Sequence, residues 1–173
     1  MSKNSPQDPH YDPYYDHIAQ GYEELHREEQ LRKIAIIKAH VAIRPDDLLL
    51  DVGCGTGLTC DFPCCVVGLD PAIALLQRTP KSLPIVQAEA EHIPFADDSF
   101  DIVSSVTAIQ NFRDIRKGLE EIRRVGKDRF ILTFLAQSAK RDAIKAAIEE
   151  LFVVDKVIEE DYDVIHVCHK DKQ

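Results

Sequence analysis

The sequence lacks long hydrophobic runs. None of its 173 residues belongs to a run approaching the roughly 18 to 20 apolar residues that span a bilayer. The first 16 residues are polar and rich in proline and tyrosine, with no apolar signal region. We therefore expect no membrane association and a cytoplasmic location.

Positive charge is also scarce. The 21 Lys and Arg residues are outnumbered by 30 Asp and Glu residues, which gives a formal net charge of -9, and no Lys/Arg run exceeds two residues. Binding to a phosphate backbone depends on clustered cations. Direct binding to RNA or DNA is therefore disfavoured.

Paired cysteine spacing is missing as well. The five cysteines are odd in number and form no C-x-x-C pair, which disfavours a disulfide framework. Cys60, Cys64 and Cys65 permit a metal hypothesis, but adjacent cysteines are awkward joint ligands and no histidine is near them in sequence. We predict no metal, and thiols that line the core or a loop.

What is present fits one α/β domain. We place it at residues 13–173, after a loose tail at 1–12. Helical spacing of apolar residues predicts two helices, or one bent helix, over 14–41. Further helices are expected briefly between Gly57 and Pro63, at 72–78 with Asp70 as N-cap, after Asp114, and from Ser138. Strands are expected at 48–50, 66–70, 83–87, 100–106 and 130–135, with a closing hairpin at 152–158 and 164–168. This alternation predicts a doubly wound sheet.

The most informative stretch is residues 48–57, with the sequence LLLDVGCGTG. Its apolar run has no polar alternation, as in a central parallel strand that is covered on both faces. The run stops at Asp51 and continues into three glycines at alternate positions. Because glycine has no Cβ, the backbone there can adopt positive φ and lie against a ligand. The stretch therefore predicts a buried strand that leads into a ligand-binding turn.

The same turn limits the class of ligand. A dinucleotide fingerprint, G-x-G-x-x-G, requires glycine at position 58, where this chain has Leu58. Asp51 would also repel a pyrophosphate at this position. A ligand with positive charge and no phosphate fits better, and S-adenosylmethionine has that character.

Two motifs resemble those of one family. Residues 51–57, DVGCGTG, resemble motif I of the class I S-adenosylmethionine-dependent methyltransferases. Residues 86–101, VQAEAEHIPFADDSFD, resemble the adenine-binding segment of the same family, including its ubiquinone-biosynthesis C-methyltransferases. The chain is thus similar to the type 11 methyltransferases. The resemblance implies a Rossmann-like sheet of about seven strands, mostly parallel, with an antiparallel C-terminal hairpin and helices on both faces.

The resemblance also implies a cofactor site. Asp70 ends a predicted strand, where its two carboxylate oxygens can accept both ribose hydroxyls. Glu89 would accept from the adenine amino group, and the Ala90 N–H would donate to a ring nitrogen. The complete expected set for S-adenosyl-L-methionine is Asp51, Gly53, Cys54, Gly55, Gly57, Asp70, Pro71, Glu89, Ala90, Ser105 and Val106.

The acceptor side is less defined by the sequence. In such families the N-terminal segment folds over the cofactor, so Tyr14, Tyr15, His17 and Tyr22 could line the acceptor cavity, with Tyr22 as first choice. No general base is assigned. Asn111 and Phe112 lack the prolines of an Asn-Pro-Pro-Tyr motif and are given no role.

The expected activity is transfer of a methyl group by in-line displacement to an unidentified acceptor. A small molecule is slightly favoured by the charge and by the absence of a recognition insertion. One alternative is a catalytic subunit that acts on tRNA or a translation factor, with a small zinc-binding activator at the sheet edge near 83–88. A second alternative is a non-catalytic scaffold subunit that retains cofactor binding.

Overall fold

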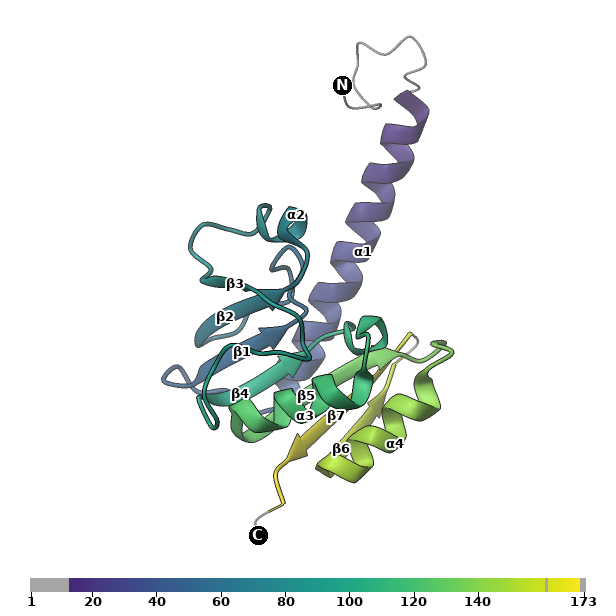
Figure 1. Cartoon of the computed structure of the whole chain (residues 1–173). Helices are drawn as coiled ribbons and strands as arrows, with labels where there is room; N and C mark the ends of the chain where they lie inside the picture. Colours follow the sequence, from purple (N-terminus) through teal and green to yellow (C-terminus); the bar gives the residue numbers. More distant parts are fainter. Residues whose placement is uncertain (1–12, 161, 172–173) are drawn as a thin grey trace.

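Seven strands form one mixed sheet. The computed structural model describes the backbone of residues 13–160 and 162–171, and side chains within those ranges from residue 27 onward. The strand order is β3-β2-β1-β4-β5-β7-β6 (Figure 1). The five neighbouring strands β3, β2, β1, β4 and β5 pair in parallel, whereas β7 is antiparallel to both β5 and β6. The predicted doubly wound sheet with an antiparallel C-terminal hairpin is confirmed.

The elements follow one another with short connections. The strands are β1 (Leu48–Val52), β2 (Cys65–Asp70), β3 (Ile85–Gln87), β4 (Phe100–Ser105), β5 (Gly126–Leu135), β6 (Val153–Glu159) and β7 (Asp163–His169). The helices are α1 (Pro13–His40), α2 (Ile73–Leu76), η1 (Ile109–Asn111, a 3-10 turn), α3 (Ile115–Val125) and α4 (Arg141–Leu151). None of the described helices is long and apolar enough to cross a membrane.

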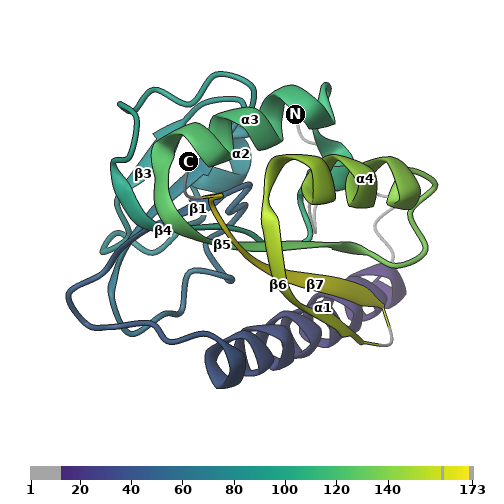
Figure 2. The same cartoon turned by 90° about the horizontal axis from the view of Figure 1, so that it is seen from below.

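Alternate residues of the central strands supply two separate cores. Leu49, Ile102 and Ile131 pack with Ile34 and Ile37 of α1 on one face. Their chain neighbours on the same strands, Leu50, Val103 and Leu132, face the other way. They pack with Leu119 of α3 and Ile144 of α4. Figure 2 shows α1 on one side of the sheet and α3 with α4 on the other. The uninterrupted apolar runs of the central strands reflect this double coverage.

The connection after β1 differs from the prediction. No helix forms between Gly57 and Pro63, where the chain makes only turns. Gly55 and Gly57 both have positive φ, 55° and 80°, which is incompatible with a right-handed helix. Too few residues then remain before Pro63 for a helix to form.

The structure also refines two helix predictions. Of the two alternatives expected for the N-terminal region, two helices or one bent helix, the structure has a single continuous helix of 28 residues. Helix α2 is shorter than the predicted 72–78, and its N-cap is Ala72, so Asp70 is not the cap. The Asp70 carboxylate nevertheless accepts a hydrogen bond from the Ala72 N–H at 2.8 Å.

Helix α3 leads directly into β5. Asp114 caps α3 as predicted, accepting from the Lys117 N–H at 3.0 Å. The helix ends at Val125 and the strand begins at Gly126, four residues before the predicted start at 130. A Cβ at Gly126 would lie 2.5 Å from Cε1 of Phe130, so only glycine permits this approach. Lys127 and Asp128 therefore belong to the strand, not to a loop.

Candidate active site

The glycine turn begins where β1 ends, with all three glycines at positive φ: 81° at Gly53, 55° at Gly55 and 80° at Gly57. A Cβ at Gly53 would lie 2.3 Å from the Cβ of Ala108, and one at Gly57 would lie 2.8 Å from Cδ2 of Leu83. Around Gly55 the nearest atom would be 3.9 Å away. Conformation thus favours glycine at all three positions, and close packing against the fixed Cβ of Ala108 also requires it at Gly53.

Asp51 lies beneath this turn. Its carboxylate is fully buried and accepts hydrogen bonds from the hydroxyls of Ser104, at 2.6 Å, and Thr59, at 2.7 Å. The Cys60 thiol donates to it at 3.5 Å. Burial raises the pKa of Asp51 above its ordinary value, and these donors oppose the shift. Asp51 therefore connects β1, β4 and the turn from below.

Asp70 holds the same turn from the side. At the end of β2 its two carboxylate oxygens accept from the Gly55 N–H, at 2.9 Å, and from the Ala72 N–H, at 2.8 Å. A carboxylate has about four acceptor positions. Asp70 can thus fix the turn and still accept two ligand hydroxyls.

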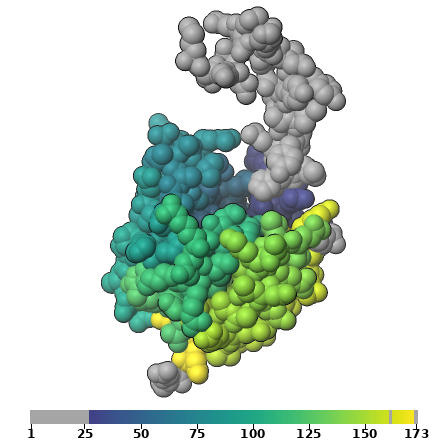
Figure 3. Space-filling view, turned by 45° about the vertical axis from the view of Figure 1, so that its right-hand side comes forward, coloured from purple at the N-terminus to yellow at the C-terminus, as the bar shows by residue number. Residues whose placement is uncertain are grey.

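A cavity of about 360 Å³ opens above these residues, at the carboxyl ends of β1, β2 and β4. We call it the donor cavity. Its size lies within the ordinary range for small-ligand sites. Its lining residues are Val52, Gly53, Gly55, Leu69, Asp70, Pro71, Leu75, Glu89, Ala90, Glu91, Thr107, Ala108, Asn111, Phe112 and Arg113. Figure 3 shows the teal lobe that carries α2 rising above the green body of the molecule, with a hollow beside it.

The structure brings six of the eleven expected cofactor residues to this cavity: Gly53, Gly55, Asp70, Pro71, Glu89 and Ala90. The other five do not line it. Ser105 is fully buried and its hydroxyl donates to the carbonyl of Val52, which joins β4 to β1. Cys54 and Gly57 belong to the turn itself, Asp51 lies beneath it, and Val106 packs in the core on the α1 face of the sheet.

Several lining residues were not identified from the sequence. Glu91 is buried and accepts a hydrogen bond from the Asp114 N–H at 3.0 Å. This bond connects residues 86–101, which resemble an adenine-binding segment, to the start of α3. Asn111, Phe112 and Arg113 reach the cavity because the chain turns through η1 after β4. Their only sequence signal was their position after a strand end, which also fits a loop without function.

Thr107 has the most unusual backbone of this group. Its φ of 55° is rare for a β-branched residue. The conformation is held because the Thr107 N–H donates to the Thr133 hydroxyl at 2.7 Å, and Gln110 donates to the Thr107 carbonyl at 2.8 Å. Such strain is typical of positions that the surrounding structure fixes for a functional reason.

The segment that carries Glu89 and Glu91 is fixed by α3. Arg124 donates to the carbonyls of Ile93, at 2.9 Å, and Phe95, at 2.8 Å. Glu121 accepts from the Ile93 N–H, and its pairing with Arg124 lowers the pKa of the Glu121 carboxyl. Nearer the cavity, Glu89 pairs with Arg113 at 3.0 Å. This wall of the donor cavity is therefore held by α3, and the lining Arg113 forms an exposed ion pair with Glu89.

The cysteines near the turn have structural contacts. All five cysteines are free, and a hydrogen bond with Cys54, together with burial and the nearby Asp51, raises the pKa of the Cys60 thiol. Burial likewise raises the pKa of Cys64. In the described residues, no three His, Cys, Asp or Glu side chains are grouped so that they could hold a metal ion.

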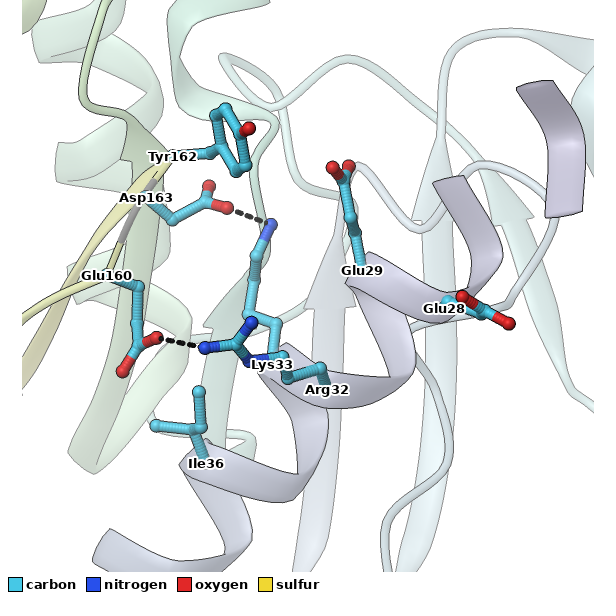
Figure 4. Close-up of a pocket in the computed structure, with 8 residues that line it drawn as sticks. All are labelled: Glu28, Glu29, Arg32, Lys33, Ile36, Glu160, Tyr162 and Asp163. Atoms are coloured by element: carbon cyan, nitrogen blue, oxygen red, sulfur yellow. Dashed lines mark hydrogen bonds and ion pairs between the residues drawn. The ribbon is translucent and has the colours of Figure 1, made fainter. Parts of the chain in front are cut away.

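A second cavity, of about 350 Å³, lies between α1 and the start of β7. It is lined by Glu28, Glu29, Arg32, Lys33, Ile36, Glu160, Tyr162 and Asp163 (Figure 4). At its base, the buried Lys33 ammonium pairs with Asp163 at 2.6 Å and donates to the Thr107 hydroxyl. Tyr14, Tyr15, His17 and Tyr22 belong to α1, outside the residues whose side chains are described.

Part of the chain matches a known protein family, and several curated proteins have similar sequences. Residues 50–134 match the family model of a methyltransferase domain, Methyltransf_11. Uncharacterized protein MJ1252 of Methanocaldococcus jannaschii is 33% identical over 123 residues, which are 70% of this chain and 49% of that protein. A demethylmenaquinone methyltransferase of Corynebacterium urealyticum is 31% identical over 90 residues, which are 49% of this chain and 39% of that enzyme. The chain thus spans half or less of the length of these curated relatives.

Solved structures share the fold. A SAM dependent methyltransferase from Aquifex aeolicus superposes with a TM-score of 0.66 at 16% identity, covering 84% of this chain and 89% of that one. A second match comes from a complex between the Trm112 methyltransferase activator of Haloferax volcanii and a protein proposed to be a methyltransferase. It gives a TM-score of 0.70 at 17% identity and covers 89% and 96% of the two chains. These structures show that the fold is shared, and the family match places residues 50–134 in the type 11 methyltransferase domain family.

Proposed function

We propose that this chain binds S-adenosyl-L-methionine in the donor cavity and transfers its methyl group to an acceptor. One observation carries the proposal. The glycine turn, at which a Cβ on Gly53 would lie 2.3 Å from Ala108, borders a cavity that is lined by the carboxylates of Asp70, Glu89 and Glu91. Such a cavity favours a cationic ligand and opposes a pyrophosphate.

The lining residues fit that ligand group by group. Asp70 has acceptor positions left for two ribose hydroxyls, beyond its bonds to the turn. Glu89 and Ala90 lie along the cavity, where a carboxylate and an N–H could meet the edge of an adenine ring. The absence of a helix after Gly57 is compatible with this ligand, because it has no phosphate that needs a helix N-terminus.

The bound cofactor would supply a methyl group on a sulfonium, which is already an excellent leaving group. The protein must then align the acceptor and exclude water. Val52, Leu69 and Phe112 give the donor cavity an apolar lining, and the strained Thr107 forms its boundary toward α1. No residue of the donor cavity is assigned as a general base.

Calorimetric titration tests this proposal. The purified chain is titrated with S-adenosylmethionine, with S-adenosylhomocysteine, and with NADH as the negative control. We expect micromolar binding of the first two and no binding of NADH. Binding of NADH, or of none of the three, would contradict the proposal. Binding followed by no methyl transfer to any acceptor in a radiolabel screen would favour the non-catalytic scaffold.

A second candidate function is methylation of tRNA or a translation factor with a small activator subunit. It is supported by the free edge of β3 and by the exposed side chains of Ile73, Leu75 and Ile85, which are 50%, 37% and 40% accessible. An unpaired strand beside exposed apolar side chains suits addition of a partner strand. The Haloferax volcanii complex shows that a protein of this fold assembles with Trm112.

Co-expression with a Trm112-type protein tests this candidate. We expect co-purification of the two chains and loss of it in Ile85→Lys. The matched control is Val157→Lys, because Val157 is 47% exposed on β6 at the opposite edge of the sheet. A chain that is soluble and stable alone and does not co-purify would favour the small-molecule methyltransferase.

A further inference from the structure

The second cavity is adjacent to the donor cavity, and Thr107 lies between them. Thr107 lines the donor cavity, and its hydroxyl donates at 3.0 Å to Oδ1 of Asp163, which lines the second cavity. Because β7 is antiparallel to β5, its first residue, Asp163, pairs with Leu135 at the carboxyl end of β5. Both cavities therefore lie at the carboxyl ends of the parallel strands.

The charges at the base of the second cavity are balanced internally. The Lys33 ammonium pairs with Asp163 at 2.6 Å, and the two side chains are only 6% and 9% exposed. Arg32 pairs with Glu160 at 3.4 Å. Neither cation of this cavity is therefore left free to attract an anion.

Two carboxylates remain uncompensated. Within the described residues, neither Glu28 nor Glu29 has an ion-pair partner. Figure 4 shows the Glu29 carboxylate and the Tyr162 ring on either side of the Lys33 to Asp163 pair, whereas Glu28 points away from it. A carboxylate opposite an aromatic ring attracts a cation, through its charge and through the negative face of the ring.

We propose that the second cavity is the acceptor site and that it selects small aliphatic amines, which arrive as ammonium ions. This inference rests on the proposed methyl transfer. At the moment of transfer the amine must be neutral, so its ammonium proton first passes to solvent. The nitrogen lone pair then forms the N–C bond, and the electron pair of the broken C–S bond stays on sulfur. The open position of Glu29 lets ammonium and solvent exchange at the cavity mouth.

The test uses three probes that differ in charge but share a four-carbon chain: 1,4-diaminobutane, 1,4-butanediol and succinate. Each is titrated by calorimetry into the protein saturated with S-adenosylhomocysteine. We expect only the diamine to bind. Glu29→Gln should weaken it about twofold to fivefold, the scale of one exposed ion pair, and Tyr162→Leu by a similar factor.

Asp46→Asn is the matched control. It removes the same charge from an exposed residue in the turn before β1, at the amino end of the parallel strands and away from both cavities. We expect it to leave diamine binding unchanged, and all variants to keep the affinity for S-adenosylhomocysteine. Equal binding of the diol or of succinate would overturn the inference, as would equal effects of Glu29→Gln and Asp46→Asn. If S-adenosylhomocysteine binds but the diamine does not, the inference fails alone. If S-adenosylhomocysteine does not bind, the proposed function fails with it.

Discussion

Gly53 faces Ala108 across the end of the sheet so closely that a methyl group at position 53 would lie 2.3 Å from the Ala108 Cβ. The contact joins the turn after β1 to the segment after β4, which together border the donor cavity. A substitution at either position should therefore move the two walls relative to each other.

Gly53→Ala should lower both stability and affinity for S-adenosylmethionine. The positive φ costs about 1 to 2 kcal/mol for a residue with a Cβ, and the overpacking adds about 1 to 3 kcal/mol. Gly55→Ala is the matched control, because it has positive φ but no atom closer than 3.9 Å. Urea unfolding and calorimetry measure both effects. We expect Ala108→Gly to recover part of the loss in Gly53→Ala but nothing in Gly55→Ala. Equal losses in the two alanine variants would refute the role of this contact.

Asp70→Ala should weaken binding of S-adenosylmethionine by about 1 to 3 kcal/mol, because charge-assisted hydrogen bonds are lost. It should also loosen the turn, since the Gly55 N–H loses its acceptor. Calorimetry measures the affinity, and circular dichroism checks that the fold is intact. An unchanged affinity in the folded variant would remove Asp70 from the proposed site.

Ser104→Ala should lower the free energy of unfolding by about 1 to 3 kcal/mol, because a buried carboxylate oxygen of Asp51 loses its donor. Ser105→Ala is the matched control, since Ser105 is equally buried but donates to a neutral backbone carbonyl. There we expect about 0.5 to 1.5 kcal/mol. Urea unfolding at neutral pH measures both. A larger loss for Ser105→Ala would show that the carboxylate is not the group that matters.

His166 should make the fold sensitive to acid. Its imidazole is buried on β7, has no hydrogen-bond partner among the described residues, and stacks on Phe134 with ring centroids 5.4 Å apart. Burial lowers the pKa of His166 from its ordinary value of 6.5. The unfolded chain therefore binds this proton more readily. Stability is fully present above about pH 6.5 and declines as the pH falls from there toward the lowered folded-state pKa.

Unfolding measured between pH 7.5 and pH 5 checks this prediction. The decline in stability should be smaller in His166→Leu, which removes the titrating group from the core. His92→Gln, at an exposed loop position, is the control and should keep the decline of the unchanged protein. Charges on α4 that influence His166, from Glu149 and Lys145, are present in every variant. Identical slopes in His166→Leu and the unchanged protein would assign the acid sensitivity to other groups.

The sequence was most informative where function depends on local backbone geometry. Alternate glycines predicted the turn because positive φ is a property of the residue itself. Asp70 could be placed because an acid directly after a strand lies at the carboxyl edge of a parallel sheet whatever the loop lengths. The amphipathic spacing after Asp114 likewise predicted α3 together with its cap.

The rest depends on long-range packing. The approach of Phe112 and Arg113 to the donor cavity requires the chain to turn at η1, which no local pattern encodes. The early start of β5 follows from pairing with β4, in which Gly126 lies opposite Phe100. The second cavity requires residues about 130 positions apart, such as Lys33 and Asp163, to meet across the sheet. Nothing in either segment indicates the other.

Because β7 enters antiparallel to β5, the two cavities at the carboxyl end of β5 and its parallel neighbours are lined by different stretches of chain. The donor cavity is lined by residues between 52 and 113. The second cavity is lined by residues of α1 between 28 and 36, together with Glu160, Tyr162 and Asp163. The hairpin turn between β6 and β7 could therefore be exchanged or lengthened, as surface turns usually tolerate, while the walls of the donor cavity keep their sequence. Protein engineers could therefore change the second cavity through the β6–β7 turn, which contributes only a few of its residues, and leave the donor cavity unchanged.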